Sequence, residues 1–416
     1  MIDPIDPIEQ SPSHEPYPLP ATALVHSLDP WPAYDRLLTH PRLYQCQAER
    51  TYIVARHADV QQALRHPHLS VGFPMRATRQ LFGPTAIDLD GARHRSARHL
   101  VSWFSASRMN TWVESAVAPV VDDLAGQITA KAPVDVVAVL GHALPVRVIC
   151  RVLGLPDEEW PWLRRKLRPI VAYISNQATG LEEALTARLE LTSRIEESLA
   201  AQLPSTSVLR RLWPDATVKP PPDTTHELTE HMRAVLLLLA AGTATTTMAI
   251  SNLFWCLLQH PDTWTHVASG QLSPSAVVAE SLRLRPPLHS TVRFATRELT
   301  LAGTPIPRGS RVQVLLAAAN RDPAVFDAPD RWNPHRPARL APVFGNGPHA
   351  CAGAQLALSE LCLLLDALSQ RFGTISPGAP ADALQSAPFH HHTSLSVVFH
   401  STPVTAPEHH REEPTP

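Results

Sequence analysis

The segment Phe344-Gly345-Asn346-Gly347-Pro348-His349-Ala350-Cys351-Ala352-Gly353 decides how this chain is interpreted. It places one cysteine in a glycine-rich loop, directly before an apolar stretch at 354–368 that predicts a helix. The backbone N–H groups of the loop and the N-terminus of that helix would both stabilise Cys351 as a thiolate. The glycines let the loop backbone approach a flat ligand at distances that a Cβ atom would forbid.

The remaining cysteines do not indicate a site. Cys150, Cys256 and Cys362 stand among apolar residues at helical spacing, which is typical of a core, and Cys46 lies in a strand-like stretch. An odd total of 5 cysteines without a CxxC pair argues against both a disulfide framework and a zinc site. Only Cys351 has the surroundings that a thiolate requires.

The composition argues against a nucleic-acid-binding protein and against a membrane protein. The chain has 416 residues, 44% of them hydrophobic, which is enough for a large core. A net charge of −2 gives no general affinity for nucleic acid or for anionic membranes. The start of the chain has no apolar signal sequence, and no uncharged apolar run approaches about 18 residues, so we expect a cytoplasmic protein outside the membrane.

The pattern along the chain predicts a mainly α-helical body with a smaller β-rich part. We expect flexible, proline-rich polar tails at 1–20 and 401–416 around one catalytic domain at 21–400. A short helix is expected at 57–65 and a loop at 71–89, and helical patterns dominate from 93 to 280. Strands are expected at 51–54, 291–294, 299–301, 312–315 and 395–399.

Two motifs of this chain resemble motifs of the cytochrome P450 family. The cysteine loop resembles its haem-binding loop, in which a phenylalanine, glycines, a basic residue and the ligand cysteine follow one another. Glu280-Ser281-Leu282-Arg283 resembles its ExxR motif, whose charged residues share one helix face. The resemblance covers about residues 20–400 and implies the cytochrome P450 fold, a haem b cofactor and Cys351 as the iron ligand. It also implies haem contacts from Phe344, Gly345 and Gly353.

The resemblance implies a bracing role for the Glu280 and Arg283 pair, which a downstream basic residue would join. Arg331 is one candidate for this structural partner, and His335 or Arg336 is the other. A direct catalytic role is not expected for this pair.

Four basic residues match positions that bind the haem propionates in the family. The run 90–101 resembles the family's C-helix, where His94 and Arg98 lie four residues apart on one face. Arg293 matches a strand arginine, and His349 matches the basic residue two positions before the cysteine. Two buried carboxylates need several cationic donors to remain ionised.

A long helix is predicted from 233 to 258, with Ala241-Gly242-Thr243-Ala244-Thr245-Thr246-Thr247 near its middle. Glycine and threonine weaken helices, and threonine hydroxyls can bond the carbonyl four residues earlier, so we expect a locally widened turn. The segment resembles the oxygen-activation motif of the family. The resemblance implies that Ala241 faces the haem, that Gly242 opens the helix and that Thr245 supplies the alcohol beside dioxygen.

Ala244 occupies the position at which that motif has an acid. Cleavage of the O–O bond needs two protons, and alanine relays none. Water or a substrate group could take over, which leaves a monooxygenase. Alternatively, the enzyme removes hydrogen atoms and couples the substrate without inserting oxygen, or the substitution has no mechanistic meaning. A haem-based sensor and an inactive binding protein are further alternatives.

Substrate contacts are expected from family position and from a histidine run. His391 and His392 belong to His390-His391-His392, of which we expect His390 to be solvated. The predicted substrate-binding residues are Phe73, Phe82, Leu238, Leu288, His289, Ser290, His391 and His392.

The chain has neither a GxGxxG fingerprint nor the cysteine spacing of an iron–sulfur protein. We therefore expect a monomer that oxidises a small organic molecule with electrons from a separate ferredoxin and ferredoxin reductase. Their docking would use basic residues near the cysteine side, such as Arg95 or Arg336.

Overall fold

A computed structural model describes residues 27–401 apart from 47–48, 105, 176–179, 202, 215–227, 337–340, 381–383 and 386–388. The predicted tails at 1–20 and 401–416 lie outside the described residues, except for Ser401.

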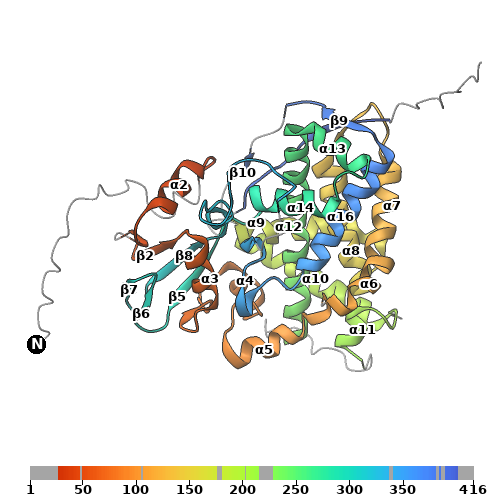
Figure 1. Cartoon of the computed structure of the whole chain (residues 1–416). Helices are drawn as coiled ribbons and strands as arrows, with labels where there is room; N and C mark the ends of the chain where they lie inside the picture. The colour runs from red at the N-terminus through yellow and green to blue at the C-terminus, as the bar shows by residue number, and fades with distance from the viewer. Residues whose placement is uncertain are drawn as a thin grey trace, which may run out of the picture.

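Helices form most of the described chain and gather into one large body, seen on the right of Figure 1. The α-helices are α2 (Trp31–Thr39), α3 (His57–Arg65), α4 (Ala77–Phe82), α5 (Gly91–His99), α6 (Ala106–Trp112), α7 (Ala118–Gln127), α8 (Ala143–Leu153), α9 (Trp160–Ser175), α10 (Leu181–Ala200), α11 (Val208–Leu212), α12 (Glu230–Gln259), α13 (Pro261–Ala268), α14 (Pro274–Leu284), α15 (Leu316–Ala319) and α16 (Ala354–Arg371).

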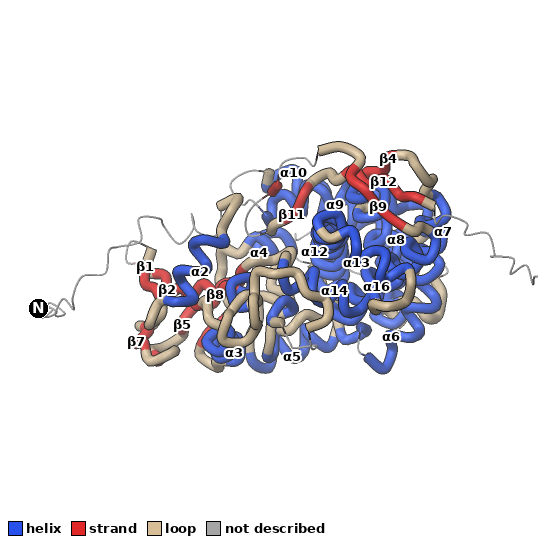
Figure 2. Tube along the Cα trace, turned by 45° about the horizontal axis from the view of Figure 1, so that its top comes forward, coloured by secondary structure: helices blue, strands red, loops and turns tan. Residues whose placement is uncertain are grey.

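Strands form a smaller part at the other end of the molecule and a second group on the helical body (Figure 2). They are β1 (Tyr44–Cys46), β2 (Thr51–Val54), β3 (Leu69–Ser70), β4 (Pro133–Asp135), β5 (Ser290–Ala295), β6 (Leu299–Leu301), β7 (Thr304–Ile306), β8 (Arg311–Leu315), β9 (Thr374–Pro377), β10 (Leu384–Gln385), β11 (His391–His392) and β12 (Ser396–His400).

The largest sheet joins strands from residues 44–70 to strands from residues 290–315, in the order β1-β2-β8-β5-β3. Strand β2 pairs with β8 in parallel, with Thr51 opposite Arg311, and the other pairs in this sheet are antiparallel. A three-stranded sheet, β4-β12-β9, and the two-stranded pairs β6-β7 and β10-β11 complete the β structure. The strands predicted at 51–54, 291–294, 299–301, 312–315 and 395–399 are confirmed, within a residue or two at their ends.

Helix α12 runs through the core because it is apolar on almost every side. It begins where the Thr229 hydroxyl accepts a hydrogen bond from the Met232 N–H, and it ends before Pro261. The expectation that no apolar run approaches the length of a membrane span was wrong, because α12 could cross a membrane by length and composition. However, 72% of its most apolar window is buried in this protein, as in core helices of soluble proteins. Its neighbours include α8, α14 and α16.

Two expectations about local structure were wrong. The segment 71–89 is not all loop, because Ala77–Phe82 forms α4, whose Leu81 and Phe82 are buried in the core. Prolines and glycines on both sides conceal so short a helix in the sequence pattern. The widened turn expected in the long helix is also absent, since α12 is a regular α-helix throughout its length. Wider π-helical turns occur instead at Val113–Val117 and Val137–Gly141.

Candidate functional site

The cysteine loop is held rigidly by its own backbone. The Cys351 N–H donates to the carbonyl of Phe344 over 2.8 Å, which closes the loop upon itself. Gly345 and Gly347 have φ values of 70° and 71°, a region that favours glycine. At Gly347 a Cβ atom would also come within 2.9 Å of the Leu64 carbonyl oxygen, so the loop can pack against α3 only with glycine there.

The same loop is tied to α3 by a side chain that the sequence alone did not indicate. Arg65 donates from Nε and Nη2 to the Asn346 side-chain oxygen over 3.1 and 3.0 Å. A Cβ added at Gly353 would meet no protein atom within 4 Å. Among the described residues, none therefore requires glycine at 353, which fits a loop that leaves room for a flat ligand.

Cys351 is exposed, although its surroundings are apolar enough to affect its ionisation. Burial raises the pKa of the Cys351 thiol, while the N–H groups of Gly353 and Ala354 and the charge of Arg98 lower it. The expected thiolate-stabilising groups are thus present, but burial has the largest effect on the pKa of the thiol. A bound metal ion would reverse the balance, because a coordinating thiol loses its proton.

Two histidines and one carboxylate meet beside the loop. The His94 and His349 rings lie 4.2 Å apart, and His349 Nε2 lies 3.2 Å from Asp90 Oδ1. Burial, followed by the charges of His94 and Arg293, lowers the pKa of His349 to about 4. Burial also lowers the pKa of His94. Asp90 does not cap α5 but contacts His349, a role that was not predicted.

Arg293 is a buried cation without a carboxylate partner in the described part of the chain. The residue is 4% exposed, and its Nη1 reaches only the Thr291 hydroxyl and the Val292 carbonyl, over 3.0 and 2.9 Å. Burial, followed by the charge of Arg76, lowers the pKa of Arg293 to about 10. A buried guanidinium in this condition lacks an anion.

Together these groups fit the haem that the cysteine loop suggests. His94, Arg98, Arg293 and His349 are basic groups that lie around one loop, and Arg293 makes no ion pair with any described residue, although the charge of Asp90 raises its pKa. A propionate carboxylate would satisfy it.

Helix α12 presents two residues toward open space within an otherwise buried segment. Ala241 is exposed and Thr245 is half-buried, whereas the leucines one turn earlier are buried. The Thr245 hydroxyl donates to the Ala241 carbonyl over 2.9 Å. Gly242 lies elsewhere, since a Cβ there would meet only Ile149 of α8, at 3.6 Å. Ala244 is half-buried and carries no polar group.

Threonine hydroxyls supplement the helical ladder of α12 without replacing it. Thr243 and Thr246 donate to the carbonyls of Leu239 and Gly242, over 2.7 and 3.1 Å. The Thr247 hydroxyl lies 3.0 Å from the Thr243 carbonyl and 2.6 Å from that of Gly141, in the neighbouring π-helical turn. This packing holds α12 in its regular form.

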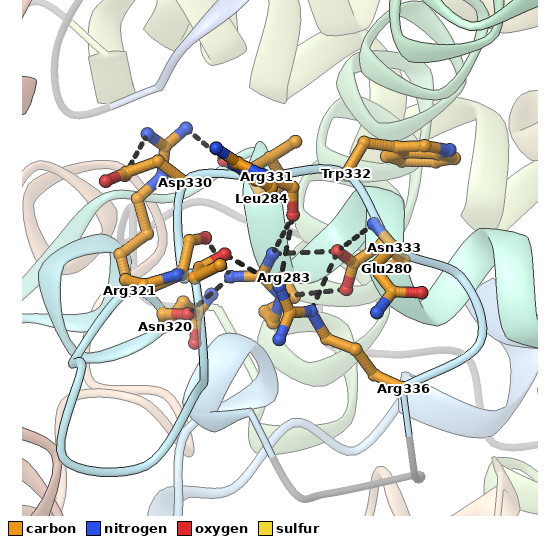
Figure 3. A network of polar contacts seen from close by, with 12 residues as sticks. Glu280, Arg283, Leu284, Asn320, Arg321, Asp330, Arg331, Trp332, Asn333 and Arg336 are labelled. Atoms are coloured by element: carbon orange, nitrogen blue, oxygen red, sulfur yellow. Dashed lines mark hydrogen bonds and ion pairs between the residues drawn. The ribbon is translucent and has the colours of Figure 1, made fainter.

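Glu280 and Arg283 form a buried, doubly hydrogen-bonded pair, with both side chains 3% exposed (Figure 3). Arg283 Nε and Nη2 each donate to one Glu280 oxygen over 2.8 Å. Of the downstream candidates, Arg336 supplies the side chain, with Nε 3.3 Å from Glu280 Oε1. Arg331 contributes its carbonyl instead, which accepts from Arg283 Nη2 over 3.2 Å. The Asn333 N–H completes the site on Glu280.

The residues predicted to bind substrate differ widely in burial. Phe73 is 37% exposed and stacks on Phe294 at 4.7 Å, but Phe82 is only 1% exposed and belongs to the core. Leu238 is buried on α12. Leu288 forms an isolated β-bridge with Phe389.

The polar members of this group have partners inside the protein. His289 Nδ1 lies 3.3 Å from the Tyr34 hydroxyl, so the ring lies beside α2. The Ser290 hydroxyl accepts from Gln313 over 2.6 Å. Burial, which is the largest cause, lowers the pKa of His289.

The histidine run is buried throughout. His390 is 2% exposed, so the expectation that it is solvated was wrong; it lies 4.7 Å from His289 in a stacked arrangement. His391 is 8% exposed, and His392 stacks on Trp255 at 6.2 Å. Burial lowers the pKa of both His390 and His391 to about 4.

Comparison with known proteins agrees with this geometry. The family model described as cytochrome P450 matches residues 275–387, which contain the Glu280–Arg283 pair and the cysteine loop. The chain is 30% identical to cyclomarin C epoxidase CymV of Salinispora arenicola over 91% of this chain and 99% of that protein. It is also 30% identical to cytochrome P450 105A3 of Streptomyces carbophilus, over 86% and 89% of the two chains.

Solved structures give the same result for the fold. The structure of CalO2 superposes with a TM-score of 0.78 at 27% identity, covering 92% of this chain and 98% of that one. Three findings lead to the same conclusion: the order and spacing of the motifs, the mainly helical architecture, and the similarity to named oxidising enzymes over most of the chain. The chain is therefore an oxidoreductase that belongs to the cytochrome P450 family of haem-iron enzymes.

Proposed function

We propose that this protein is a monooxygenase that binds haem b and inserts one atom of dioxygen into a small natural product. The proposal rests on two solvent-accessible residues in the interior of the fold: Cys351, before α16, and the half-buried Thr245 on α12. Cys351 would supply a thiol ligand to a bound haem, and Thr245 would supply a hydroxyl beside it. The similarity to an epoxidase of a natural product supports this substrate class.

The residues of this chain would hold the cofactor and supply protons. Cys351 would ligate the iron, while Arg98, Arg293, His94 and His349 would bind the propionates. Haem, when bound, supplies the redox chemistry of dioxygen, and a thiolate ligand favours O–O cleavage. The Thr245 hydroxyl must turn from the Ala241 carbonyl to donate its proton into the open space. Ala244 cannot resupply that proton, so water or the substrate must do so.

Labelled dioxygen and product mass separate the two reaction types. A monooxygenase adds one labelled oxygen atom to the product. Oxidative coupling, the alternative suggested by Ala244, removes two hydrogen atoms and adds no label. A product without label from a coupled system would overturn the proposal in favour of coupling.

Variants of α12 test the proton route. Thr245→Ala should lower product formed per electron by tenfold or more, since a positioned proton donor contributes about 10²–10⁴-fold. Thr246→Ala is the matched control, because its hydroxyl is buried and donates to Gly242 within the helix. Ala244→Glu should raise the yield of oxygenated product if an acid at 244 is all that the relay lacks.

We further propose a cytoplasmic monomer that receives electrons from a ferredoxin and its reductase. Arg95 is exposed on α5, close in sequence to the loop contact Arg98, and is free to meet an acidic partner. Arg336 is the weaker candidate, because its side chain already binds Glu280 and the carbonyls of Ala328 and Arg331. Arg95→Glu should slow reduction by ferredoxin, most strongly at low salt; an unchanged rate would exclude this docking residue.

A further inference from the structure

A cavity of about 600 Å³ is lined by residues of α12, the end of α14 and the segment 321–332, and by no residue of the cysteine loop. It lies where α12 and α14 both end, and the segment 321–332 closes its other side. Trp255 on its wall follows Thr245 by ten residues along α12, which places the two about 15 Å apart. The cavity therefore differs from the site around Cys351.

Arg285 is a buried cation that lines this cavity and has no anionic partner among the described residues. The residue is 8% exposed, and its guanidinium carbon lies 3.9 Å from the centroid of the Trp255 ring. Its side chain makes no hydrogen bond or ion pair within the part of the chain that the structure describes, and its Nε is buried and unsatisfied. A guanidinium has five N–H donors, so most of its binding capacity is unused.

The charges around Arg285 leave the cavity cationic. Arg321 uses its side chain on Asp330 Oδ1 and on the Leu284 carbonyl, over 3.0 and 2.9 Å, so the carboxylate of Asp330 is already engaged (Figure 3). Arg331 is exposed, and its side chain has no polar partner among the described residues. Arg285 and Arg331 thus remain as two cations on the cavity wall that make no ion pair with any described residue.

Aromatic rings give the cavity flat, firmly held walls. The Trp332 ring stacks on His260 with centroids 5.4 Å apart and planes inclined by 5°. Its Nε1 donates to the Thr263 hydroxyl over 3.0 Å, which fixes its orientation. Trp255 is held between Arg285 and the His392 ring. Such walls favour a planar apolar group next to the cationic one.

We propose that this cavity binds a small organic oxyanion, in which a flat apolar body carries a carboxylate or phosphate group. Arg285 and Arg331 take the oxyanion, because a guanidinium pairs with either group through parallel N–H donors. Trp255 and Trp332 contact the flat body. The occupied site would join the helix that carries Thr245 to the helix that carries the Glu280–Arg283 pair.

Titration of the haem-loaded full chain with benzoate and with phenyl phosphate tests the proposal. These probes share a flat body and differ in the oxyanion. Calorimetry should show saturable binding of at least one probe, at one site, without a change in the Soret absorption of the haem. The probe that binds more tightly assigns the carboxylate or the phosphate class.

Matched variants decide where the probe binds. Arg285→Gln should weaken binding at least tenfold, and Arg331→Gln, at an exposed side chain that does not threaten the fold, should weaken it as well. Arg165→Gln, at an exposed position on α9, should bind like the unmodified protein. The proposal is overturned if neither probe binds, if both Arg285→Gln and Arg331→Gln bind normally, or if binding shifts the Soret band and persists in these variants.

Discussion

Arg98 Nη2 donates a hydrogen bond to the carbonyl oxygen of Ala350 over 2.6 Å, directly before the cysteine of the loop. This contact joins α5 to a loop more than half the chain away in sequence. The charge of Arg98 also lowers the pKa of the Cys351 thiol, against the larger effect of burial. One side chain therefore positions the loop and favours the ligand form of its sulfur.

Replacing Arg98 by glutamine should weaken haem binding by about 10- to 100-fold. A hydrogen bond from a charged donor contributes about 1.5–3 kcal/mol, and the variant also loses a propionate partner. Haem titration into the cofactor-free protein measures the change. Arg95→Gln, exposed on the same helix, is the control. Equal haem affinity in the two variants would show that Arg98 does not serve the site.

Replacing Cys351 by serine should abolish the red-shifted Soret band of the reduced protein under carbon monoxide, because that band requires a thiolate ligand. The matched control is Cys362→Ser, at a half-buried cysteine on α16 outside the loop. The band should persist in the control. Its persistence in Cys351→Ser would assign the iron ligand to another residue.

The sequence predicted those elements whose conformation depends on neighbouring residues in the chain. The strand at 51–54 and the helix at 57–65 were predicted with the bounds that the structure shows. The glycines around Cys351 also have a local explanation, because Gly345 and Gly347 have positive φ values. In each case a few adjacent residues determine the conformation.

Long-range partners could not be predicted in the same way. His390 looks like a turn residue, yet it is buried because His289 and Trp31, distant in sequence, lie against its ring. The spacing at 330–336 could not decide between Arg331 and Arg336, since the difference depends on the path of the backbone past Glu280. The regular form of α12 similarly depends on packing against a neighbouring turn.

Replacing Glu280 by glutamine should destabilise the protein by about 3–5 kcal/mol, because the charge of Arg283 then remains buried without its counter-ion. Urea unfolding of the haem-loaded protein measures the loss. Glu197→Gln is the control, since the Glu197 side chain is 70% exposed and lies 3.5 Å from Arg194, where an ion pair contributes less than about 1 kcal/mol. Similar losses in both variants would contradict a bracing role for the buried pair.

Acid should destabilise the fold through its buried histidines, and His391 provides the test. Burial, then the charges of His390, His392 and His142, lowers the pKa of His391 to about 4, against about 6.5 in an unfolded chain. Between these values the unfolded chain binds more protons than the folded one, so stability falls as pH decreases from about 6.5 to 4 and is constant above that range.

His391→Gln should therefore flatten this pH dependence, by up to about 1.4 kcal/mol per pH unit. Urea unfolding at several pH values from 4.5 to 7.5 gives the slope. His99→Gln, at the exposed end of α5, should keep the slope of the unmodified protein. If the slope in His391→Gln equals that in His99→Gln, protonation of His391 does not cause the loss of stability in acid. The neighbouring buried histidines would then account for that loss.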